Sequence, residues 1–137
     1  MQLKHIDITN AEGSVYALRL TLGGQKALRK LYGKEVLDIL MDAITDGEVM
    51  AEVLQQAAHF PESPQSFQVT GEDIYNELVD SGFHGQLPWA NLVVDLAECS
   101  GLIDAKQASK LHARFAAAVD AATEQMGDNP TASPEIY

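Results

Sequence analysis

The chain lacks several features that usually indicate a function. It has one cysteine, Cys99, among its 137 residues, so neither an internal disulfide nor a cysteine metal cluster can form. With no adjacent basic group, this thiol is expected to be buried and inert. No apolar run approaches the roughly 20 residues of a membrane-spanning helix, and the first ten residues lack the apolar core of a signal peptide. We therefore expect a cytoplasmic protein.

Positive charge is also scarce. Nine Lys and Arg stand against 20 Asp and Glu, which gives a formal net charge of −11. Phosphate backbones and anionic membrane surfaces are bound by clustered Lys and Arg, so we expect neither nucleic acid nor membrane as a partner. An acidic surface keeps a protein soluble, and this alone explains the excess of negative charge. The alternative explanation is that the surface binds a basic protein partner.

Motifs for catalysis or ligand binding are missing or incomplete. The four histidines lie too far apart to form a helical metal pair at i and i+4. Gly23-Gly24 follows a strand pattern, but the spacing of phosphate-binding loops is absent. Asp42, Asp46 and Gly47 lack the other ligands of a calcium loop. The sequence therefore predicts no catalytic residue, no cofactor and no metal.

Four carboxylates on one predicted helix are the best basis for an enzyme. They are Glu72, Asp73, Glu77 and Asp80. Acid–base catalysis needs two carboxylates in differently tuned environments, whereas a solvated helical face explains the same residues and is more frequent. A small acid–base enzyme is therefore the less favoured alternative, and it requires a deep pocket lined by two of these carboxylates.

The hydrophobic pattern predicts a mainly α fold. Alternating residues over 2–9 and 14–22, separated by a turn, predict a short N-terminal β-hairpin within residues 1–22. Apolar residues at helical spacing then predict a compact bundle of about six helices in a single domain over residues 1–126. The polar, proline-containing segment 127–137 is expected to be a disordered tail.

Glycines mark the expected ends of the first elements. Gly23-Gly24 is expected to break the second strand, because glycine readily adopts the backbone conformations of a turn. A helix over 25–32 follows, and Gly33 is expected to cap its C-terminus.

Polar residues predict where later helices begin. Thr45 and Glu48 have the spacing of a capping box, with Thr45 as the N-cap. Thr70 and Asp104 are predicted N-caps of two further helices. Between these helices, the proline- and serine-rich segment 60–68 is predicted to be a loop.

Two groups of side chains are candidates for contacts with a partner. One is the local positive cluster of this acidic chain, which would suit an acidic patch on a neighbouring copy; a solvated helical face is the alternative. The other is a set of aromatic residues of the kind enriched in interface hot spots, which core packing explains at least as well. The predicted contact residues are Lys26, Arg29, Lys30, Tyr75, Phe83 and Trp89.

The stretch YALRLTLGGQKALRKLYGKEVLDIL, from Tyr16 to Leu40, resembles the start of tail assembly chaperones of long-tailed, siphovirus-type bacteriophages and prophages. In those proteins a hairpin leads into a helix that ends in leucine, a few residues, Gly, Lys and a hydrophobic residue, here Leu28 to Val36. The block GEDIYNELVDSG is also similar, and the resemblance covers roughly residues 14–103.

The resemblance implies a non-enzymatic role. Such chaperones are thought to coat the long helical tape-measure protein, keep it soluble, and yield to tail-tube subunits during assembly. The implied partners are therefore the tape-measure and tail-tube proteins, and self-association is a further expectation. The N-terminal hairpin is one candidate for that self-contact, because its edges need cover. An acidic helical adaptor or regulator that binds one partner stoichiometrically remains the alternative.

Overall fold

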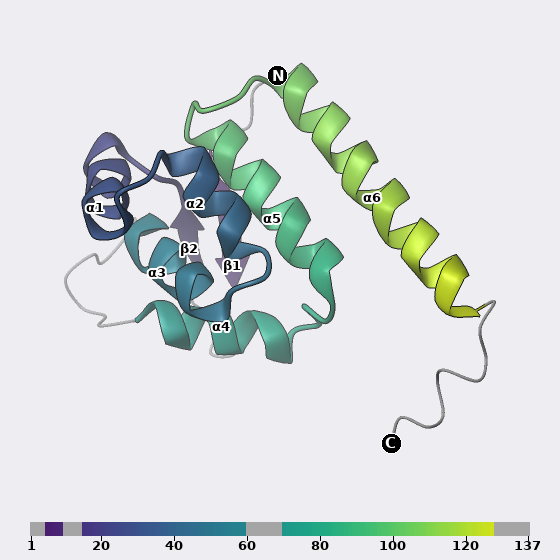
Figure 1. Ribbon diagram of the computed structural model, residues 1–137. Helices are drawn as coiled ribbons and strands as arrows, with labels where there is room; N and C mark the ends of the chain where they lie inside the picture. Colours follow the sequence, from purple (N-terminus) through teal and green to yellow (C-terminus); the bar gives the residue numbers. More distant parts are fainter. Residues whose placement is uncertain (1–4, 10–14, 60–69, 128–137) are drawn as a thin grey trace.

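The computed structural model describes residues 5–9, 15–59 and 70–127 (Figure 1). The helices are α1 (Leu22–Tyr32), α2 (Val36–Ala43), α3 (Gly47–Ala57), α4 (Gly71–Asp80), α5 (Gln86–Cys99) and α6 (Ala105–Gly127). The strands are β1 (Ile6–Thr9), β2 (Val15–Leu18) and β3 (Ala58–His59). The predicted mainly α fold with an N-terminal hairpin is confirmed. The predicted loop 60–68 and the tail from residue 128 onward lie outside the described residues.

The sheet contains a strand that the sequence pattern did not predict. β1 pairs antiparallel with β2, with Ile6 opposite Leu18. β3 pairs antiparallel with the other edge of β2, and Leu18 lies opposite Ala58. A two-residue strand has no detectable alternation, so only the fold could reveal it. The hairpin is thus joined directly to the end of α3, because the chain passes from Ala57 into β3 without a loop.

The predicted break at Gly23-Gly24 is wrong. β2 ends at Leu18, and α1 begins at Leu22, so both glycines lie in the first turn of the helix. Thr21 ends the extended segment as the N-cap, and its hydroxyl accepts a hydrogen bond from the Gly24 N–H at 3.3 Å. A threonine N-cap satisfies a backbone donor that the first helical turn would otherwise leave unpaired.

Gly24 has a packing role. A Cβ placed on it would lie 3.0 Å from the Gln56 carbonyl oxygen of α3, so its missing side chain lets α1 approach α3 closely.

Gly33 caps α1 as predicted: it adopts φ 67° and donates its N–H to Arg29 O at 2.8 Å.

One predicted N-cap is wrong by one residue, and two are confirmed. Asp46, not Thr45, caps α3, because its carboxylate accepts hydrogen bonds from the backbone N–H groups of the first helical turn. A carboxylate at this position also favours the positive end of the helix dipole. Thr70 caps α4 within a capping box. Asp104 caps α6 and exchanges two hydrogen bonds with Gln107, at 2.7 and 3.0 Å.

The main core is formed by β2 and α1 to α5. Its largest fully buried side chains include Leu18, Leu28, Leu40, Leu54 and Ile74. The connection between β2 and α1 is fixed to the end of α5, because the Leu20 N–H donates to the Ser100 hydroxyl at 2.8 Å.

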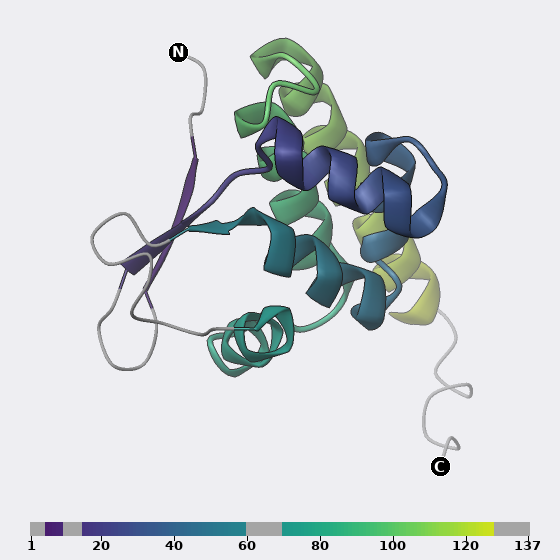
Figure 2. The same cartoon turned by 90° about the vertical axis from the view of Figure 1, so that its left-hand side faces the viewer.

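α5 is covered on two sides. Leu92 and Leu96 belong to the main core, whereas Ala90 and Val94 are each 2% exposed yet lie outside that cluster. α6 packs on α5 beside the rest of the bundle, with Ala108 buried (Figures 1 and 2). α6 is thus attached to the outside of a core that the other elements already enclose.

Candidate functional site

The large hydrophobic side chains that remain well exposed are concentrated on α1 and α2. Among the described residues they are Leu22, Leu31, Leu37 and Met41, with exposed fractions of 62, 57, 41 and 45%. Leu37 and Met41 are four residues apart, so they share one face of α2. The opposite face of α2 is already buried through Ile39 and Leu40. We call these four exposed residues the α1–α2 apolar patch.

Cations flank the α1–α2 apolar patch. Lys26 and Lys30 are exposed on α1, and Arg29 is half-buried. Lys34 forms an ion pair with Asp42 of α2, and its hydrogen bond to this carboxylate raises the pKa of the lysine. The predicted positive cluster therefore lies where a partner of the patch could reach it.

The three predicted aromatic contact residues do meet, but around a buried ring. Trp89 is only 7% exposed. The Tyr75 ring stacks on it with centroids 4.6 Å apart and planes 10° apart. Phe83 meets Trp89 edge-on, with centroids 5.0 Å apart. Such pairs stabilise a core, so the packing alternative accounts for Trp89, while the half-buried Tyr75 and Phe83 keep some surface.

An acidic cleft lies between α3, α4 and the end of α1. It has a volume of about 860 Å³. Its carboxylates are Asp46, Glu48, Glu52 and Glu72, and none of its lining residues is Lys, Arg or His. Two tyrosines, Tyr32 and Tyr75, and several small or polar side chains complete the wall. We call this the α3–α4 acidic cleft.

The negative potential of the α3–α4 acidic cleft acts on Tyr32. Burial is the largest cause that raises the pKa of this phenol, and the charges of Glu52, Asp46 and Glu48 raise it further. Like charges oppose the formation of a phenolate. The cleft therefore favours a cationic group and disfavours an anionic one.

The cleft does not supply the pocket that the enzyme alternative requires. Of the four carboxylates predicted for that role, it is lined by Glu72, whereas Asp73, Glu77 and Asp80 are not among its lining residues. Within the described ranges, no group of three or more His, Cys, Asp or Glu could hold a metal ion.

Sequence reasoning missed the cleft because its walls come from separate elements. The sequence did contain one indication of an acidic surface, because Glu48 and Glu52 are four residues apart and so are neighbours on one helical face. Glu72 joins them only because α4 packs on α3.

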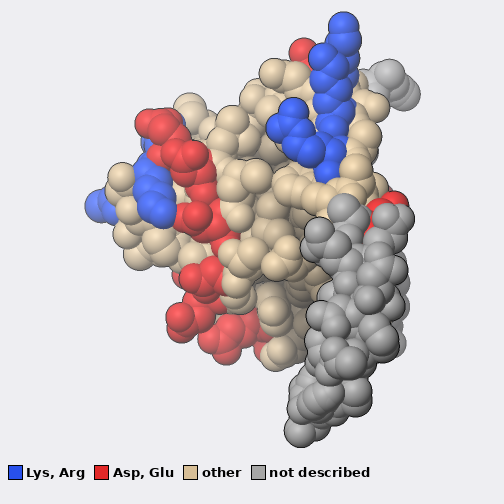
Figure 3. Space-filling view, turned by 45° about the vertical axis from the view of Figure 1, so that its right-hand side comes forward, with Lys and Arg blue, Asp and Glu red and all other residues tan. Residues whose placement is uncertain are grey.

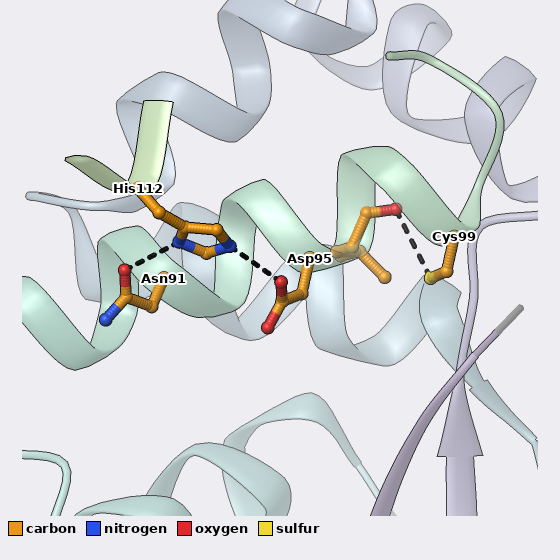
Figure 4. A network of polar contacts seen from close by, with 5 residues as sticks. Asn91, Asp95, Cys99 and His112 are labelled. Atoms are coloured by element: carbon orange, nitrogen blue, oxygen red, sulfur yellow. Dashed lines mark hydrogen bonds and ion pairs between the residues drawn. The ribbon is translucent and has the colours of Figure 1, made fainter. Parts of the chain in front are cut away.

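A polar network joins α5 to α6 (Figure 4). His112 of α6 lies between two α5 side chains: its Nδ1 is 2.8 Å from Asn91 Oδ1, and its Nε2 is 2.8 Å from Asp95 Oδ1. One turn further along α5, the Cys99 thiol is buried and donates to Leu96 O at 3.4 Å. Burial raises the pKa of this thiol, so the expected inert cysteine is consistent with its surroundings.

Comparisons with known proteins add no family. Neither protein-family models, nor curated proteins, nor solved structures gave a match to this chain. Across the residues described, no helix is both long and apolar enough to cross a membrane.

Proposed function

We propose that this protein is a tail assembly chaperone of a long-tailed bacteriophage or prophage. In this role it binds the tape-measure protein, keeps it soluble and helps to recruit tail-tube subunits in the cytoplasm of a bacterial host. The sequence resemblance over Tyr16 to Leu40 motivates the proposal. The observation that carries it is the α1–α2 apolar patch, which lies within or beside the same stretch.

The α1–α2 apolar patch has the chemistry that a helical client requires. A long helical protein exposes an apolar stripe until it is assembled, and a partner shields that stripe with apolar side chains of its own. Leu37 and Met41 leave one face of α2 apolar and exposed, and exposed apolar surface of this kind occurs at interaction sites. Met41 adds a flexible side chain that adapts to irregular partners. The net charge of −11 would keep such a complex in solution.

Co-expression with a fragment of the tape-measure protein tests the proposal. The fragment is expected to appear in the soluble fraction and to co-purify only when the chaperone is present. Replacing two exposed residues of the patch, in the variant Leu37→Glu/Met41→Glu, should reduce co-purification by about tenfold or more, since interface anchors often contribute more than about 1.4 kcal/mol.

The matched control places the same charge elsewhere. Gln86 and Ser109 are exposed and lie outside the patch, so Gln86→Glu/Ser109→Glu, which adds the same two negative charges, should leave co-purification unchanged, and circular dichroism should show that all variants fold. If the wild-type protein leaves the fragment insoluble, or if the patch variant binds as well as wild type, the proposal fails. Binding of one chaperone per fragment, without further copies, would instead favour the adaptor alternative.

A further inference from the structure

α6 carries a row of cations that is separate from the positive cluster on α1. Lys106, Lys110 and Arg114 are four residues apart and therefore lie on one face of the helix. All three are exposed. Figure 3 shows blue Lys and Arg side chains gathered on one part of the surface and bordered mainly by uncharged residues. Within the described part of the chain, none of the three forms an ion pair.

The α3–α4 acidic cleft presents charges of the opposite sign at the same spacing. Glu48 and Glu52 are four residues apart on α3, as Lys106 and Lys110 are on α6. Four residues advance a helix by about 6 Å, so the two pairs can face each other in register. Asp46 and Glu72 extend the negative surface beyond this pair, where Arg114 could be accommodated.

The two surfaces do not face each other within one molecule. α6 packs on α5, and α5 stands between α6 and the elements that form the cleft (Figures 1 and 2). The cationic row points away from α5, because Ala108 and His112 occupy the side of α6 that contacts α5. A contact between row and cleft must therefore join two molecules.

We infer that the cationic row of α6 in one copy binds the α3–α4 acidic cleft of a second copy. Because the two surfaces differ, each copy keeps one free row and one free cleft, and association proceeds head to tail. Largely exposed ion pairs are weak and are screened by salt, so the association should be reversible and strongest at low ionic strength. The contact goes beyond the proposed function, because it requires no tape-measure protein.

Sedimentation velocity of the full chain over a concentration series tests the contact. The wild-type protein should sediment faster as its concentration rises in about 50 mM salt, and this dependence should disappear in about 500 mM salt, where the Debye length is much shorter. Two reversals, Lys106→Glu/Lys110→Glu on the row and Glu48→Lys/Glu52→Lys in the cleft, should each abolish association. An equimolar mixture of the two variants should restore it, because both surfaces are then complementary again.

The control changes the net charge by the same amount at another surface. Lys26→Glu/Lys30→Glu changes the α1 cluster that the sequence predicted for partner contacts, and this variant should retain self-association, because the inferred contact uses the α6 row instead. If Glu48→Lys/Glu52→Lys does not fold, the single change Glu52→Lys replaces it in the mixture. The inference is overturned if the wild-type protein stays monomeric at low salt or if the row reversal still associates. It is also overturned if the mixture does not recover association, or if only the α1 reversal abolishes it.

Discussion

α4 and α6 are attached to the same bundle in opposite ways. α4 approaches α3 so closely that a Cβ on Gly71 would lie 1.7 Å from the Ala51 carbonyl oxygen. The Gly71 N–H donates to Gln55 Oε1 at 2.6 Å, which fixes the start of α4 on α3. α6 packs on α5 with Ala108 buried. His112 of α6 lies 2.8 Å from side-chain oxygens of Asn91 and Asp95 on α5.

The difference separates an element of the core from an element on its surface. α4 contributes Ile74 and Leu78 to the main core, whereas Leu111 and Phe115 of α6 are only half-buried. Local stability follows the burial of apolar contacts. We therefore expect α6 to detach from α5 without unfolding the remainder, whereas α4 should unfold only with the whole domain.

The largest effect is expected for Gly71→Ala. The added methyl group would overlap the α3 backbone, which cannot move aside as a flexible side chain can. Overpacking usually costs about 1–3 kcal/mol, and a backbone overlap at this distance should reach about 3 kcal/mol or more. Urea denaturation followed by circular dichroism would measure the loss.

Gly23→Ala is the matched control for that substitution. Its Cβ would meet nothing closer than the Thr21 hydroxyl at 3.9 Å, and alanine favours a helix over glycine by up to about 1 kcal/mol. Gly23→Ala should therefore leave the free energy of unfolding unchanged or raise it. Equal stability of the two variants would show that α3 and α4 are not packed as closely as described.

A leucine truncation on each helix compares their attachments directly. Leu78→Ala on α4 removes a side chain that is 5% exposed and should cost about 3 kcal/mol. Leu111→Ala on α6 removes a half-buried one and should cost about 1 kcal/mol, in proportion to the smaller area buried. Equal losses in the free energy of unfolding would contradict the distinction between the two helices.

A smaller and local effect is expected for His112→Ala. The change removes both contacts of the imidazole to α5, and a net hydrogen bond contributes about 1 kcal/mol. Hydrogen exchange should become faster in α6 and remain unchanged in α4. His84→Ala serves as the control, because His84 is exposed and its imidazole Nε2 lies 3.2 Å from Val79 O, in the preceding helix α4. Faster exchange throughout the domain would show that α6 is part of the core.

The smallest effect concerns the chemistry of Cys99. Burial raises the pKa of the thiol above its ordinary value of 9.0, so it stays protonated near pH 7, and the thiolate is the reactive form. A disulfide reagent should modify the native protein slowly and the urea-unfolded protein quickly. Because the folded state holds this proton more tightly, the unfolded state loses it first as the pH rises. The free energy of unfolding should therefore fall only above about pH 9. Rapid modification of the native protein would exclude the buried position.

The sequence predicted those features that depend on neighbouring residues. The hairpin, the helical periodicity and the caps at Gly33, Thr70 and Asp104 are each encoded within a few positions of the chain. The N-cap of α3 was predicted at Thr45 and lies at the next residue, Asp46. Threonine and aspartate are both favoured at N-caps, so residue type does not separate them.

The features that were missed depend on contacts between distant segments. Gly24 was predicted to serve in a turn and Gly71 had no predicted role, yet each allows a close approach to α3. The α3–α4 acidic cleft and the pairing of β3 with β2 arise from the same long-range packing. Of the predicted contact residues, the cations lie on the surface and Trp89 lies in the core, a difference that residue type alone does not specify.

The third strand has a consequence for the order in which the chain folds. An isolated two-stranded hairpin is marginally stable in water, and here β2 gains its second neighbour, β3, only from the far end of α3. Pairing residues so distant in sequence requires a large loop to close first. The helices α1 to α3 should therefore assemble before the sheet is completed, and a peptide of residues 1–22 should remain unstructured on its own.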